Sequence, residues 1–284
     1  MVFSMSSQLA IVLGWVLRTV CGGGASGTVP TASAGVDTVF AEGFESGSFA
    51  AWDDRGGASN QAIVTGADLA HSGNRVLEVT FPLGSDGGWL TKFFLPGYDS
   101  LYVGYWVRPQ IPWLSGTKLV SFYGSRTDDR WSATGKAGQC PNGTDFFAAV
   151  VAMLRTANPG PTRFYTYYPA MARERDGVTC YGSLGLRPGE AASYYEPTEI
   201  TPGAWHHIEF WVVLNTPGQS NAVQRMWIDG VLRGTWSGIS LRTSSILMLN
   251  AVTITNSIAG GSLQTQRMWV DDILVARTRP GGTR

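Results

Sequence analysis

The amino-acid sequence predicts an all-β protein whose strands pack as a two-sheet antiparallel jelly-roll sandwich. Its 284 residues include 36 glycines, 11 tryptophans, 10 tyrosines and 12 phenylalanines, and these residue types favour tight turns and pleated sheet. After the N-terminal segment the sequence has no sustained helical periodicity, which argues against α/β architectures with a parallel sheet. Hydrophobic residues make up 44% of the chain and charged residues only 15%, so the chain can bury a substantial core.

Eight segments have the length and the β-branched or aromatic content of strands, and eight strands need at least two sheets. In chain order they are residues 75–82, 100–109, 145–155, 163–169, 204–215, 224–236, 247–256 and 266–277. The Asp229 and Gly230 pair predicts a tight hairpin turn within the sixth segment. The string RMW[I/V]D occurs at 225–229 and again at 267–271. Two copies indicate equivalent strands of a sandwich, because solenoids need three or more repeats.

The segment 207–214 has the alternation of a strand that is covered on one face. One face carries the apolar set Ile208, Phe210, Val212 and Leu214. The opposite face carries His207, Glu209 and Trp211. His207 and Trp211 are therefore candidate ligand-binding residues, and a hydrogen-bonded histidine and a packed tryptophan are the structural alternatives.

The N-terminal residues 1–34 are interpreted as an export leader followed by a flexible linker, and residues 35–284 as a single sandwich domain. Residues 9–17 form an apolar run with the length of a signal-peptide core, which is too short to span a bilayer. Cleavage after Ala34 and lipoprotein-type processing at Cys21 both remain open. We expect a secreted or cell-envelope protein with no membrane attachment beyond a lipid anchor at Cys21.

Removing that leader leaves two cysteines, Cys140 and Cys180. In an exported protein such a pair most simply forms a disulfide, which would close a loop of about 40 residues and stabilise the fold by roughly 3–4 kcal/mol. Neither cysteine belongs to a Cys-x-x-Cys pair and the three histidines form no cluster, so no metal site is expected. No cofactor is expected either, and only Asp271 and Asp272 are considered for a structural calcium ion.

The charge balance limits the choice of partner. With 21 basic and 21 acidic residues the net charge is zero, which gives no electrostatic footprint for nucleic acid. Between residues 116 and 175, however, eight basic residues face only four acidic ones. This excess is either scattered solvated charge or the lining of a groove for an anionic ligand.

Two tyrosines, Tyr165 and Tyr167, stand two positions apart in a predicted strand. Side chains at i and i+2 point to the same face of a sheet, so both hydroxyl groups are expected on one surface. The pair is either cross-strand packing or the acid and base of an active site.

Several strings resemble the concanavalin-A-like sandwiches of polysaccharide lyases. They are EGFESGSFAAW near the start of the domain, residues 202–230 with the strings WHHI, LNTPG and WIDG, and the final MWVDDILVAR. The middle of the chain has YWVRP, GTKL, AMLR and YTY in that order. This pattern is similar to the alginate lyases of polysaccharide lyase family 14.

The resemblance implies cleavage of a uronic-acid polymer by β-elimination, with Lys118, Arg155, Tyr165 and Tyr167 as the catalytic residues. A cation must stabilise the charge on the substrate carboxylate, a base must remove the C5 proton and an acid must protonate the leaving oxygen. Arg155 and Lys118 suit the first role and the tyrosines the other two. In the alternative assignment Lys118 is the base and one tyrosine the acid. Arg163, His207 and Trp211 are expected to bind the substrate.

Two other classes of function remain open. A carbohydrate-binding module on the same fold would keep a groove and aromatic residues but would need no acid or base. A glycoside hydrolase would need two carboxylates about 5–10 Å apart, and the Glu-x-Asp-x-x-Glu strand signature of such sandwiches is absent. We expect a monomer that acts on an acidic polysaccharide.

Overall fold

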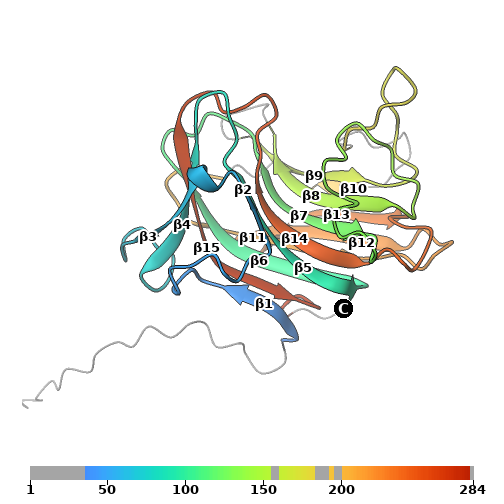
Figure 1. The fold of residues 1–284 in the computed structure, drawn as a ribbon, viewed down its shortest axis with the longest axis horizontal. Helices are drawn as coiled ribbons and strands as arrows, with labels where there is room; N and C mark the ends of the chain where they lie inside the picture. The colour runs from blue at the N-terminus through green and yellow to red at the C-terminus, as the bar shows by residue number, and fades with distance from the viewer. Residues whose placement is uncertain (1–35, 155–159, 183–191, 195–199, 282–284) are drawn as a thin grey trace, which may run out of the picture.

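The computed structural model describes residues 36–154, 160–182, 192–194 and 200–281, with only the backbone described for 192–194. Within these residues the chain forms two antiparallel sheets and no α-helix (Figure 1). The predicted all-β jelly-roll sandwich is thereby confirmed. The predicted leader, including Cys21 and Ala34, lies outside the described residues. None of the described residues belong to a helix that is long and apolar enough to span a membrane.

The larger sheet has nine strands. Eight of them lie in the order β10 (Ala192–Tyr194), β13 (Val231–Ile239), β12 (Ala222–Ile228), β11 (His206–Val213), β6 (Ser100–Pro109), β15 (Gln266–Ala276), β4 (Arg75–Phe81) and β3 (Gln61–Thr65). The ninth strand, β1 (Thr38–Glu42), also pairs with β15. A short 3-10 turn, η1 (Ala58–Asn60), precedes β3.

The smaller sheet has six strands. Their order is β2 (Asp54–Gly56), β5 (Gly88–Tyr98), β14 (Leu249–Asn256), β7 (Lys118–Ser125), β8 (Phe146–Met153) and β9 (Thr162–Tyr167). Strands β5 and β7 were not among the eight predicted segments. Both contain polar or small residues on the face that is not covered by the core, and β5 also contains Pro96, so neither has a strong strand pattern.

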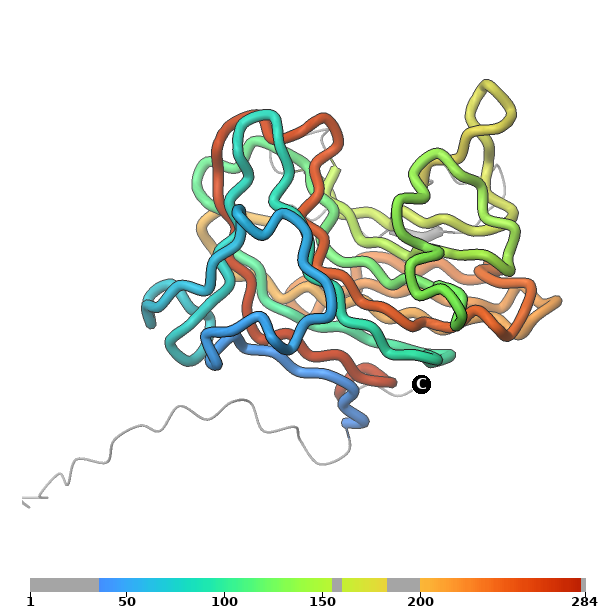
Figure 2. The backbone as a smooth tube through the Cα atoms, in the orientation of Figure 1, coloured from blue at the N-terminus to red at the C-terminus, as the bar shows by residue number. Residues whose placement is uncertain are grey.

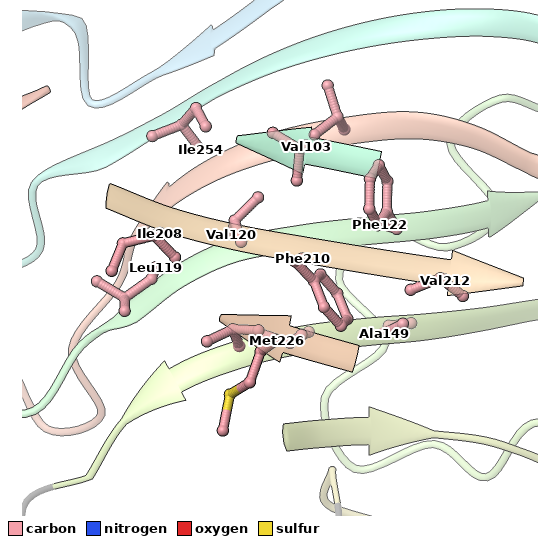
Figure 3. Packing of buried hydrophobic residues seen from close by; sticks show 14 of the residues in the cluster. Val103, Leu119, Val120, Phe122, Ala149, Ile208, Phe210, Val212, Met226 and Ile254 are labelled. Carbon is pink, nitrogen blue, oxygen red and sulfur yellow. The ribbon is translucent and has the colours of Figure 1, made fainter. Parts of the chain in front are cut away.

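The core lies between the two sheets. Figure 3 shows Phe122 of the smaller sheet near Phe210 of the larger one, and their ring centroids are 5.6 Å apart. Ile208 and Phe210 are fully buried, as the alternation in residues 207–214 predicted. Complete burial of a side chain of this size contributes roughly 1.5–3 kcal/mol to the free energy of unfolding. The two side chains of β11 therefore stabilise the packing of the larger sheet on the smaller one.

The predicted turn at Asp229 and Gly230 connects β12 to β13. Both residues have positive φ, 53° and 76°, as a type I′ hairpin requires. The two RMW strings fall on β12 and β15 of the same sheet, and in both the methionine, Met226 or Met268, is buried in the core. The two copies agree in burial at this methionine and at Ile228 or Val270, but Asp229 is exposed whereas Asp271 is fully buried.

The predicted disulfide between Cys140 and Cys180 is present, with a Cα–Cα distance of 5.0 Å. It joins two loops that follow different strands of the smaller sheet, residues 126–145 after β7 and residues 168–182 after β9. Figure 2 shows both loops, in green and yellow, standing side by side at one end of the molecule. Cys180 also donates its backbone N–H to the carbonyl of Gly138 at 3.1 Å.

Candidate active site

A cavity of about 340 Å³ opens on the outer face of the six-stranded sheet, and we call it the cleft. Its floor consists of side chains from β5, β14, β7, β8 and β9, and the loop 126–145 forms a wall. In the middle of the floor the side chains are short, and the hydroxyls of Thr91 and Thr253 hydrogen-bond to each other at 2.9 Å. Short hydroxylated side chains leave room for a polar ligand above the sheet.

The strand register determines which side chains are neighbours on the cleft floor. Across β7, β8 and β9, Ser121 pairs with Val150 and Val150 with Tyr165, whereas Tyr123 pairs with Ala148 and Ala148 with Tyr167. Phe164, just before Tyr165, packs into the core, and Thr166, between the two tyrosines, is fully buried, so Tyr165 and Tyr167 point outward into the cleft. Ala148 lies between Tyr123 and Tyr167 in this row, and its small side chain leaves the space between these two phenols open.

Lys118 reaches the cleft because of a β-bulge. The β7–β8 register shifts between Lys118 and Val120, and both Leu119 and Val120 are buried in the core. One extra residue in a strand re-aims the side chains that precede it. Lys118 consequently lines the cleft, and its amine nitrogen lies 5.1 Å from the centre of the Tyr165 ring.

The two phenols of the predicted pair contact each other directly. The hydroxyl oxygens of Tyr165 and Tyr167 are 3.3 Å apart, and the rings meet edge to face with centroids 5.7 Å apart. The structure thus brings Lys118, Tyr165 and Tyr167 together in one cleft. This is the convergence that an acid and base need and that a simple binding module does not.

Burial shifts the pKa values of these groups toward their neutral forms. Burial lowers the pKa of Lys118, and the nearby Asp86 opposes this effect. Burial also raises the pKa of Tyr165, and the hydrogen bond with Tyr167 raises it further. Burial thus disfavours the ammonium form of Lys118 and the phenolate form of Tyr165, and these are the directions of shift that suit a base and an acid respectively.

A third phenol, Tyr123, lines the same cleft and was not singled out from the sequence. Burial raises its pKa, a hydrogen bond with Ser121 partly offsets this, and Tyr167 lies close enough to raise it again. The sequence signal was the string KLVSFYGS, which places Tyr123 two positions after Ser121 on one strand face. It was missed because that segment was not recognised as a strand.

The loop 126–145 supplies cationic and aromatic groups to the cleft. Arg130 and Lys136 line it together with Trp131, whose side chain is 41% exposed. The guanidinium of Arg130 lies 5.0 Å from the Phe93 ring centre and 5.1 Å from that of Trp131. Among the described residues of the predicted basic segment, three cations thus reach the cleft, counting Lys118. Exposed aromatic rings of this kind can stack on sugars.

Two predicted substrate-binding residues, His207 and Trp211, lie elsewhere. They occupy the outer face of the larger sheet, because Ile208 and Phe210 point from β11 into the core and the alternating residues point away from it. His207 stacks on Trp106 with centroids 5.0 Å apart, and the Trp211 indole N–H donates to the Ser100 hydroxyl at 2.9 Å. The structure therefore does not bring His207 and Trp211 together with the two tyrosines.

The remaining predicted residues have different outcomes. Arg163 lies on the cleft face of β9 and pairs in register with Ala152, itself opposite Lys118, but it does not line the cavity. Arg155 lies outside the described residues.

Asp271, which was considered for a structural calcium ion, accepts hydrogen bonds from the backbone N–H groups of His71 and Asp272 at 2.9 and 2.8 Å. Among the described residues no cluster of His, Cys, Asp and Glu side chains could hold a metal ion.

Solved structures with the same fold include several polysaccharide lyases. The PL-14 alginate lyase from Aplysia kurodai has a TM-score of 0.61 at 13% identity, over 85% of this chain and 99% of that one. The alginate lyase from Chlorella virus has a TM-score of 0.59 at 12% identity, over 80% and 93%. The endo-β-1,4-glucuronan lyase from the fungus Trichoderma reesei has a TM-score of 0.54 at 13% identity, over 85% and 96%. These similarities support the sandwich fold.

A search of curated proteins gives no match. The family model described as Polysaccharide lyase 14, in contrast, matches residues 96–269. This range begins in β5 and ends in β15, so it includes the strands that carry Lys118, Tyr123, Tyr165 and Tyr167. The match extends over more than half of the chain, and the chain therefore belongs to polysaccharide lyase family 14.

Proposed function

We propose that this protein is an exported lyase that cleaves a polyuronate, alginate or a close relative of it, by β-elimination in the cleft. The observation that carries the proposal is that the Lys118 amine lies 5.1 Å from the centre of the Tyr165 ring in the cleft where the Tyr165 and Tyr167 hydroxyls contact each other. Two further findings support the substrate class. The cleft wall is cationic, and proteins of the same fold include alginate lyases and a glucuronan lyase.

In this reaction a base removes the proton from C5 of the uronate, a double bond forms between C4 and C5, and the C4–O4 bond breaks while an acid protonates O4. We assign the base role to Lys118, because burial lowers its pKa and favours the neutral amine. The acid role goes to Tyr165, because burial and Tyr167 keep its phenol protonated. This is the second of the two assignments that the sequence left open, and it requires no phenolate in a site that disfavours one.

The negative charge that builds on the substrate carboxylate needs a cation. Arg130 and Lys136 of the cleft wall are available in the described part of the chain. Arg155 keeps the carboxylate-binding role proposed from the sequence, since a guanidinium can hold a carboxylate with two hydrogen bonds. Arg163 lies in the same cross-strand row as Lys118, with Ala152 between them, and is assigned to substrate binding at the edge of the cleft.

A glycoside hydrolase is disfavoured by the carboxylates. Among the described residues that line the cleft, only Asp54 carries one, whereas hydrolysis by the usual mechanism needs a pair. Export is supported by the disulfide, because such bonds persist in oxidising compartments. The leader, its processing and a lipid anchor at Cys21 remain proposals from the sequence.

The test is to incubate the purified protein with alginate, polyglucuronate and hyaluronan and to follow the ultraviolet absorbance of the unsaturated product. We expect unsaturated oligosaccharides from at least one polyuronate and none from neutral glucans. Retained binding to a polyuronate without any unsaturated product would instead establish a binding module.

A further inference from the structure

The segment Cys180–Gly182 packs directly against the proposed acid, Tyr165. Gly182 lies so close to the ring that a Cβ atom added to it would come within 2.3 Å of Cε1 of Tyr165. Its backbone does not adopt the left-handed conformation that favours glycine. Glycine is required here by space and not by backbone geometry, which indicates that the close approach to the phenol ring is the feature that matters.

Gly182 also interacts with the phenol oxygen. The backbone N–H of Gly182 lies close enough to the Tyr165 hydroxyl to lower the pKa of Tyr165, against the dominant raising effect of burial. The Tyr165 hydroxyl therefore has the Gly182 backbone amide nearby and the hydroxyl of Tyr167 at 3.3 Å. A donor that stabilises the phenolate assists proton transfer from the phenol to the leaving oxygen.

The disulfide fixes this segment to the cleft wall. Cys180, two residues before Gly182, is fully buried and is bonded to Cys140 in the loop that carries Lys136 to the cleft. The only other described backbone link between the two loops is the bridge from Cys180 to Gly138. Without the disulfide, this bridge between Cys180 and Gly138 would be the remaining described backbone link that holds the Gly182 segment against the loop 126–145.

We infer that Gly182 is a positioning residue for the Tyr165 hydroxyl and that the Cys140–Cys180 disulfide holds it in place. The inference rests on the proposed function only for its kinetic consequence. The disulfide thus does more than stabilise the fold, because it couples the substrate-binding wall to the orientation of the acid. A displacement of about 1 Å at such a group can lower the rate by roughly a hundredfold.

The first test is Gly182→Ala, whose Cβ would push the Tyr165 ring away. We expect kcat to fall roughly 10- to 100-fold, a much smaller change in KM, and an altered alkaline limb of the pH profile. The matched control is Gly43→Ala, since Gly43 is also outside the left-handed region and its added Cβ would meet only Asp272 Oδ1 at 3.6 Å. This control should keep wild-type kinetics, and both variants should retain the wild-type melting temperature within a few degrees.

The second test is the double variant Cys140→Ser and Cys180→Ser, assayed at a temperature where circular dichroism shows it folded. We expect a similar fall in kcat in the wild-type background and little further fall in the Tyr165→Phe background. Equal losses in both backgrounds would mean that the disulfide acts only on general stability, and wild-type kcat in both Gly182→Ala and the double variant would overturn the inference.

A readout independent of activity separates this inference from the proposed function. In protein labelled with ¹³C at tyrosine Cζ, the Tyr165 signal is assigned by its absence in Tyr165→Phe. We expect that signal to move in Gly182→Ala and in the double cysteine variant, and to stay in Gly43→Ala. A moved signal with no lyase activity in the wild type refutes the proposed function alone, whereas an unmoved signal refutes the positioning role.

Discussion

The hydroxyl oxygens of Tyr165 and Tyr167 lie 3.3 Å apart on the floor of the cleft. The two phenols can therefore share one hydrogen bond, and loss of the Tyr167 hydroxyl would remove one of the influences that raise the pKa of Tyr165. Because the two tyrosines are two positions apart on the same face of β9, a substrate ring above the sheet can reach both hydroxyls. Their roles are best separated by removing the hydroxyls one at a time.

Replacement of Tyr165 by Phe should lower kcat by about 10²- to 10⁴-fold, the usual contribution of a general acid. Tyr167→Phe should cost less, and the double variant should resemble Tyr165→Phe, because residues that act as a unit are not additive. Initial rates of unsaturated product formation from alginate check this. Tyr98→Phe, outside the cleft and packed on Phe94, is the control. Substantial activity in the double variant would contradict the assignment.

Lys118→Arg should abolish most activity, because a guanidinium does not lose its proton in the accessible pH range. In the wild type, kcat/KM should rise with pH through the pKa of Lys118, which burial lowers from its ordinary value. The rise should therefore be complete at a lower pH than for an exposed lysine with a pKa of about 10.4. Lys118→Met should be inactive yet melt at a higher temperature at neutral pH, since burying a charged amine is costly. A pH profile that is unchanged in a partly active Lys118→Arg would exclude Lys118 as the base.

Trp131→Ala and Lys136→Ala should raise KM for a polyuronate more than they lower kcat, because both residues line the wall of the cleft and not its reacting centre. The KM of the wild type should also rise with ionic strength, and this dependence should weaken in Lys136→Ala. Trp211→Phe, on the other sheet, is the control and should leave KM unchanged. A raised KM in Trp211→Phe alone would contradict this prediction, because it would place the binding surface on the outer face of the larger sheet.

Asp271 should make stability depend on pH. It is fully buried, and burial together with the neighbouring Asp272 raises its pKa to about 7. Since the unfolded value is about 3.9, the folded state binds more protons in between, so this contribution falls as the pH rises from about 4 to about 7.

The check is to compare melting temperatures of Asp271→Asn and wild type across that range. The difference should shift in favour of the variant as the pH rises and then level off. Asp37→Asn, an exposed carboxylate paired with Arg277, controls for the loss of a charge. A constant difference between Asp271→Asn and wild type would show that Asp271 does not titrate in this range.

Local patterns in the sequence determined a large part of the fold. The alternation in residues 207–214 assigned Ile208 and Phe210 to the core, and the Asp229 and Gly230 pair defined a hairpin turn, because side-chain direction and turn type depend on neighbouring residues only. The spacing of Tyr165 and Tyr167 likewise placed both phenols on one face. Two cysteines outside the leader left one simple pairing, which the structure contains.

The tertiary structure alone decided which face of which sheet carries the cleft. His207 and Trp211 had the alternation of exposed residues, but the sheet that faces the ligand is set by strand pairing over long sequence distances. The same holds for Lys118, whose direction depends on a bulge in its pairing with β8, and for Gly182, whose neighbour Tyr165 is brought close by loop packing and the disulfide. Sequence therefore determined which side chains share a strand face, whereas only the packing of distant segments decided which of those faces meet around one cleft.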